Sequence, residues 1–78
     1  MEEYLFNAIA KVMKPFTLEA NMLEVCVRDK GIVVVSAFNN DGSIFYNEDR
    51  QFVSAKDLPN RAWNKLRPEK GNKLYLFV

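Results

Sequence analysis

Apolar side chains recur at helical spacing near the beginning of the chain. Within residues 2–14 they follow the spacing i, i+1, i+4, i+7, i+8, and the members of this stripe are Leu5, Phe6, Ile9, Val12 and Met13. Acidic residues open the segment and lysines close it, which is the order that the helix macrodipole favours. Pro15 then disfavours helical backbone in the residue before it. The pattern predicts an amphipathic helix over residues 2–14.

The apolar pattern changes to a period of two in the next part of the chain, and β-branched residues become frequent. Four segments are predicted to be strands on this ground, and they are residues 23–28, 32–38, 43–46 and 73–78. The turn signal between the second and third of them, Asn39-Asn40-Asp41-Gly42, is the strongest in the sequence. Residues 47–51 are predicted to be a polar loop.

A short second helix is predicted from Leu58 to about Arg67. Ser54 begins a segment with the spacing of a capping box, and Asp57 is an alternative N-cap. The position of Pro59 favours Asp57, because proline is tolerated in the first turn of a helix. The predicted element order is α-β-β-β-α-β. We therefore expect one α+β domain over residues 1–78, an antiparallel meander packed with two helices and a C-terminal strand.

The length of the first hairpin loop decides which strand residues share a face. If Asp29-Lys30-Gly31 is a three-residue loop, Val27 pairs with Val33 and Val25 with Val35. The predicted core face then consists of Leu23, Val25, Val27, Val33, Val35 and Ala37. A loop of the same kind at residues 40–42 completes a second apolar surface, a candidate protein interface formed by Ile32, Val34, Phe38, Ile44 and Tyr46. A two-residue loop there would swap the faces of the third strand.

Three arrangements are compatible with this second apolar surface. One helix covers each face of the sheet, which makes the surface ordinary core. Alternatively, both helices cover one face and a second subunit covers the other. In the third arrangement, the surface binds a different protein or a ligand, because a large exposed apolar patch on a monomer usually marks an interaction site.

Charge is nearly balanced over the whole chain and unevenly spread along it. The net charge of +1 excludes an acidic nucleic-acid mimic and a strongly basic, histone-like protein. Residues 1–55 carry a net charge of −3 and residues 56–78 a net charge of +4. Basic and aromatic residues together can hold a nucleic-acid backbone and stack a base. The candidate nucleic-acid contacts are Lys56, Arg61, Trp63, Lys65, Arg67, Lys70 and Lys73.

The residues most often used in catalysis and metal binding are scarce. The chain has no histidine, which removes the usual general base near neutral pH and the commonest metal ligand. Its one cysteine, Cys26, cannot form an internal disulfide or a cysteine-based zinc site, and we expect it to be packed and structural. We expect no cofactor, no metal and no catalytic residue.

The compartment is inferred from the same composition. A single thiol suits a reducing environment, and the acidic start Met1-Glu2-Glu3 is unlike a signal peptide. The longest apolar run, residues 74–78, is far too short to span a membrane. We expect a cytoplasmic protein without membrane contact.

The function class that these observations favour is a small non-enzymatic binding or regulatory module that acts through protein–protein contacts, with a homodimer as one form of it. The alternative is a nucleic-acid-binding module that uses the basic C-terminal helix and strand.

Overall fold

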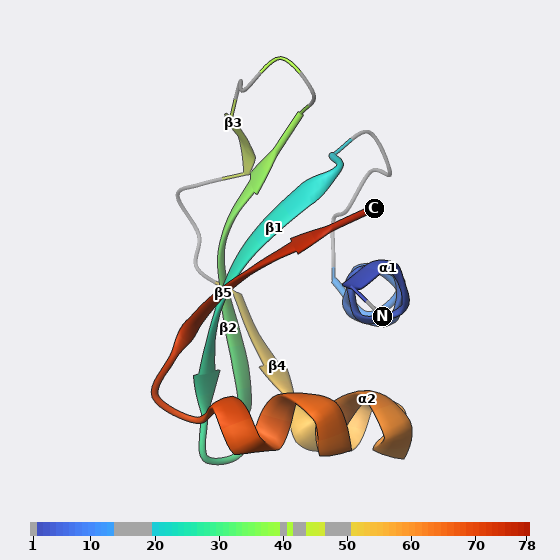
Figure 1. The fold of residues 1–78 in the computed structure, drawn as a ribbon, viewed down its shortest axis with the longest axis vertical. Coiled ribbons are helices and arrows are strands. Elements are labelled where there is room, and N and C mark those ends of the chain that lie inside the picture. Colours follow the sequence, from blue (N-terminus) through green and yellow to red (C-terminus); the bar gives the residue numbers. More distant parts are fainter. Residues whose placement is uncertain (1, 14–19, 40, 42–43, 47–50) are drawn as a thin grey trace.

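The fold is described from a computed structural model, which describes residues 2–13, 20–39, 41, 44–46 and 51–78. The helical elements are α1 (Glu2–Ala10), α2 (Asn60–Leu66) and two 3₁₀ turns, Ala55–Asp57 and Arg67–Glu69. The strands are β1 (Met22–Arg28), β2 (Gly31–Phe38), β3 (Ile44–Tyr46), β4 (Gln51–Ser54) and β5 (Lys73–Phe77). The predicted α+β class is confirmed (Figure 1).

The five strands form one sheet in which every pairing is antiparallel. The order is β3-β2-β1-β5, and β4 pairs with the same edge of β2 as β3 does. Gly31 to Val34 pair with β4, while Ala37 and Phe38 pair with β3. β5, the last strand in the chain, therefore lies at one edge of the sheet, beside the first strand.

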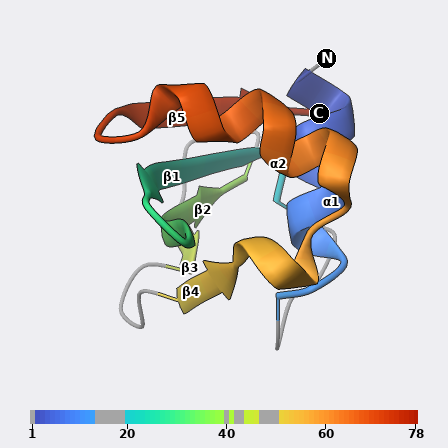
Figure 2. The same ribbon diagram turned by 90° about the horizontal axis from the view of Figure 1, so that it is seen from below.

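Both helices pack on the same face of the sheet (Figure 2). The core between the two helices and the sheet is a single cluster, to which α1 contributes Leu5, Phe6 and Ile9 and α2 contributes Ala62 and Leu66. Full burial of one such aliphatic or aromatic side chain stabilises the fold by about 1.5–3 kcal/mol. The amphipathic stripe predicted for the first helix thus faces the core. The helix itself ends at Ala10, before the predicted end at residue 14.

The register of the first hairpin differs from the prediction. Val27 pairs with Ile32 and Val25 with Val34, because the loop is the two-residue turn Asp29–Lys30. The pairing then shifts by one residue, so that Glu24 pairs with Ser36 and Val35 is the extra residue of a β-bulge. The predicted register holds beyond the bulge and is wrong between the bulge and the turn.

Two further elements differ from the sequence-based expectation. β4 is an additional short strand that begins at Gln51, a residue predicted to be loop. Along the chain, four strands instead of three therefore separate α1 from α2. Ser54 accepts a hydrogen bond from the Lys56 amide and caps a 3₁₀ turn, while Pro59 occupies the N-cap of α2 without a side-chain bond. The preference for Asp57 as the N-cap is therefore wrong. Residues 40, 42–43 and 47–50 lie outside the described residues, and with them half of the predicted turn over residues 39–42 and most of the predicted loop over residues 47–51.

Candidate functional site

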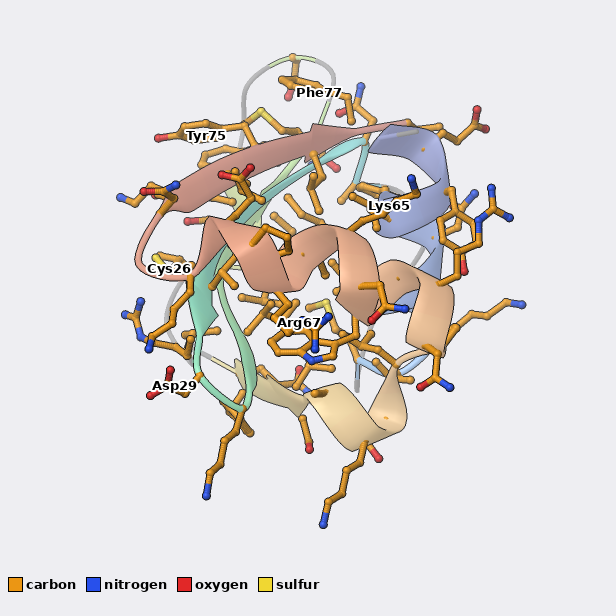
Figure 3. The ribbon with its side chains drawn as sticks, turned by 60° about the horizontal axis from the view of Figure 1, so that its bottom comes forward. Cys26, Asp29, Lys65, Arg67, Tyr75 and Phe77 are labelled. Carbon is orange, nitrogen blue, oxygen red and sulfur yellow. The ribbon has the colours of Figure 1, made fainter. Side chains whose placement is uncertain are left out.

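The face of the sheet turned away from α1 and α2 is the candidate site, and we call it the open face. Alternation along β1 and β5 places on it Met22, Glu24, Cys26, Lys73, Tyr75 and Phe77. Pairing through β2 and β4 adds Val33 and Phe52. Figure 3 shows Cys26 and Tyr75 projecting from the side of the sheet opposite α1. No described helix covers these side chains.

Exposed apolar area is concentrated on β5 and just after it. The large apolar side chains that are most exposed in the described part of the chain are Phe52 (53%), Tyr75 (50%), Phe77 (46%) and Val78 (61%). Three of these four belong to residues 75–78. Tyrosine and phenylalanine combine a large apolar surface with few rotatable bonds, which is why they are enriched in protein interfaces.

Phe52 differs from the aromatic residues of β5 because its ring has a packing role within the chain. A Cβ placed on Gly31 would lie 2.8 Å from the Cζ atom of Phe52 and 2.2 Å from the backbone oxygen of Val53. The ring therefore covers the glycine backbone of the neighbouring strand. This contact accounts for one face of the Phe52 ring without any partner molecule.

A polar cluster crosses the middle of the open face. The Ser36 hydroxyl donates a hydrogen bond to Glu24 Oε1 at 3.0 Å, and Lys73 Nζ lies 2.8 Å from Glu24 Oε2. The Glu24 side chain is only 13% exposed, and both of these contacts stabilise its buried charge. The hydrogen bond and the charge of Glu24 raise the pKa of Lys73 above its ordinary value. The cluster places an ion pair and a hydrogen-bonded hydroxyl at the centre of the open face.

This cluster is poorly placed for catalysis. Ser36 is 7% exposed and its hydroxyl hydrogen is directed at a carboxylate, so a substrate cannot reach the oxygen in this structure. Cys26 is a free, half-buried thiol on the same face, in cross-strand register with Lys73. Among the described residues, no group of three or more Cys, Asp or Glu side chains is arranged to hold a metal ion.

The predicted interface residues do not form one surface. Ile32 and Val34 are 0% exposed and belong to the helix-covered face, because the two-residue turn and the bulge place them opposite Val27 and Val25. Phe38 is half-buried and lies on the open face. Ile44 and Tyr46 belong to β3 as predicted, but their side chains lie outside what the structure describes.

The predicted nucleic-acid contacts are also dispersed. Arg61 lies over the ring of Tyr4 in α1, 4.5 Å from its centroid, and Trp63 is half-buried against the core. Lys70 forms an ion pair with Asp29. Lys73 lies on the open face, whereas Lys65 and Arg67 are exposed on the α2 side of the molecule (Figure 3). Lys56 is exposed on the 3₁₀ turn that follows β4. The seven residues therefore occupy several separate surfaces.

Tyr75, Phe77 and Phe52 were not predicted as interface residues. In the sequence of the last strand, Leu74 and Leu76 are as apolar as the two aromatic residues between and after them. No polar alternation therefore shows which side of this strand meets the helices. The one available signal is the charge of Lys73, which indicates that its side of the strand is exposed. Tyr75 and Phe77 lie on the same side as Lys73 because side chains alternate along a strand.

No protein-family model, curated protein or solved structure matches this chain. The described helices, of which α1 is the longer with nine residues, include none that is long and apolar enough to cross a bilayer. The assignment of function therefore depends on the geometry of the open face.

Proposed function

We propose that this chain is a small non-enzymatic module that acts through protein–protein contacts, and that the contact surface is β5 with the part of the open face beside it. The occupant that we propose is a second copy of the chain. The observation that supports this proposal is the gathering of Tyr75, Phe77 and Val78, each about half exposed, at one edge of the sheet.

Burial of these side chains is the driving force of the proposed contact. Apolar surface removed from water contributes about 25 cal/mol per Å², and aromatic side chains provide most of it in protein interfaces. The net charge of +1 leaves little long-range repulsion between two copies. The one basic group on the described part of this edge, Lys73, is already paired with Glu24 of its own chain.

The test is the mass in solution of the wild-type chain and of a Tyr75→Lys/Phe77→Lys double variant. We expect the wild-type chain to approach twice its monomer mass of 9.0 kDa as its concentration rises from about 10 μM to about 1 mM. The double variant adds two charges per copy to the contact and should remain monomeric, with an unchanged circular dichroism spectrum.

The matched control is Asn64→Lys, which adds a charge at an exposed position of α2, the helix that packs on the covered face of the sheet. It should associate like the wild-type chain. A wild-type chain that keeps the monomer mass at about 1 mM would overturn the proposal.

Nucleic-acid binding is the alternative function, and the position of Lys73 beside Tyr75 and Phe77 is the observation that favours it. Aromatic side chains on an uncovered sheet can stack the bases of a single strand, while a neighbouring cation holds a phosphate. Fluorescence anisotropy of a labelled single-stranded oligonucleotide tests this alternative. It requires binding that weakens steeply with added salt and is lost in Tyr75→Ala.

A further inference from the structure

The backbone of β5 has one side without hydrogen-bond partners in the described part of the chain. The amide of Val27 donates to Asn72 O and the amide of Val78 donates to Asn21 O, which fixes the phase of the ladder between β1 and β5. In an antiparallel ladder, only every second residue bonds to a given neighbour. Residues 72, 74, 76 and 78 therefore face β1, and residues 73, 75 and 77 direct their N–H and C=O groups away from the sheet.

This outer side of β5 is open to approach by another strand. Figure 1 shows β5 in front of the other strands, and no described ribbon passes in front of it. Edge strands are commonly protected from intermolecular pairing by proline, a bulge or charged side chains. β5 contains no proline, its pairing with β1 runs without a register shift, and Lys73 is its only charged residue.

We infer that two copies of this chain associate by antiparallel pairing of their β5 strands about a two-fold axis at Tyr75. In this register, Lys73 lies opposite Phe77 of the second copy, and Tyr75 lies opposite its counterpart. Because Tyr75 is the middle residue of β5, this register pairs all five residues of the strand. It also joins the three residues with outward-facing backbone groups in hydrogen-bonded pairs, so the two sheets become one continuous sheet.

The side chains are compatible with this register. Like charges do not face one another, because the single cation, Lys73, meets an aromatic ring of the second copy. On the helix-covered side, Leu74 meets Leu76 of the second copy, which extends the apolar core across the axis. The inference rests on the proposed self-association and adds its geometry.

Stacking of two open faces is the competing geometry, and two observations disfavour it. The centre of the open face holds the Glu24–Lys73 pair and Ser36, whose desolvation would be costly. Phe52, at the far side of that face, already packs over Gly31. Stacking would bury both features, whereas pairing of the β5 edges leaves Phe52 uncovered and the open side of the Glu24–Lys73 pair exposed to water.

The first experiment is amide hydrogen exchange of the wild-type chain at low and high concentration. Pairing of the edges predicts that the amides of Lys73, Tyr75 and Phe77 exchange at least about tenfold more slowly when the chain is mostly dimeric. Those of Leu74 and Leu76, which already bond to β1, should change little. A dimer in which the three outward amides exchange as fast as in the monomer would overturn the inference.

The second experiment compares Tyr75→Pro with Tyr75→Ala. Both variants lose the ring, but only proline also removes the outward N–H, and an edge strand tolerates proline where its N–H faces solvent. We expect sedimentation velocity to show at least about tenfold weaker association for Tyr75→Pro than for Tyr75→Ala. If Tyr75→Pro fails to fold, the hydrogen-exchange pattern of the wild-type chain alone decides whether the β5 edges pair.

Phe52→Ala separates the two geometries. Pairing of the edges predicts wild-type association for this variant, since Phe52 is three strands away from β5. Equal association of the two Tyr75 variants, together with loss of association in Phe52→Ala, would replace edge pairing by face stacking and leave the proposed function intact. A wild-type chain that never associates would overturn both.

Discussion

The two faces of the sheet use the same kinds of residue in β2 and bury them to different extents. Ile32 and Val34 are fully buried beneath the helices, whereas Val33 and Val35, which are equally apolar, are only half-buried. The position of α1 and α2 causes this difference, since all four residues have similar β-propensity. Local sequence thus builds the strand, and packing assigns its faces.

The edges of the sheet differ in a comparable way. One edge of β2 is shared by two short strands, β3 and β4, while the opposite edge of the sheet is the single strand β5. Exposed aromatic side chains coincide at β5 with backbone groups that have no partner among the described residues. A substitution on the helix-covered face should therefore act on folding, and one at β5 on the association that we propose.

Val34→Lys is the change with the largest expected effect, and it tests the difference between the two faces directly. A lysine at this fully buried position would place an unpaired charge in the core. We expect a loss of at least about 4 kcal/mol of the free energy of unfolding, a large part of the total for a domain of this size. The variant should already be largely unfolded at room temperature, so heating it from there should show no cooperative transition by circular dichroism.

Val33→Lys is the matched control for this prediction. The lysine stem can lie along the open face with its ammonium group in water, so we expect a folded protein and a loss of about 1 kcal/mol. Equal damage from the two substitutions would show that both faces are covered, and would contradict the assignment of the open face.

The pattern of apolar residues was sufficient to predict the first helix, β1, β2 and β5. These are the elements in which a period of 3.6 or 2, or a β-branched run, extends over several residues. β4 was missed because Gln51–Ser54 has only four residues, and its pairing with Gly31–Val34 depends on the fold of the rest of the chain. Short strands of this kind are stabilised by their neighbours more than by their own sequence.

The candidate site was harder to predict than the fold. One residue in the length of the first turn, together with the bulge at Val35, moved Ile32 and Val34 from the predicted interface into the core. A run of β-branched residues contains no polar position that fixes its register. The exposed side of β5 depended in the same way on packing, because Leu74 and Tyr75 are both suited to a core.

Gly31→Ala has the next largest expected effect and tests whether close packing also exists on the open face. The added Cβ would lie 2.2 Å from the backbone oxygen of Val53, so β4 must move as well as the Phe52 ring. We expect a loss of about 3 kcal/mol in urea unfolding, together with changed chemical shifts for the Phe52 ring protons.

Gly71→Ala is the control, because no atom lies within 4 Å of the position of the new Cβ. Gly71 has a φ of 88°, so alanine there carries only a backbone cost of about 1–2 kcal/mol. It should leave the Phe52 resonances unchanged. Wild-type stability of Gly31→Ala would contradict the close approach of β4 to β2.

The smallest expected effect concerns the charged pair on the open face and depends on pH. Glu24 raises the pKa of Lys73 in the folded chain, so folding favours the ammonium form. The pair therefore stabilises the protein fully below the unfolded-state pKa of about 10.4, and this contribution is lost as the pH rises through the higher folded-state value. Comparison of wild-type and Lys73→Met urea midpoints should show a constant difference from about pH 7 to 9 that shrinks towards about pH 12.

Lys65→Met, which removes an exposed ammonium group from α2, should show no such change with pH. A wild-type advantage that stays constant up to about pH 12 would mean that the ammonium charge of Lys73, and with it the ion pair to Glu24, does not contribute to folding.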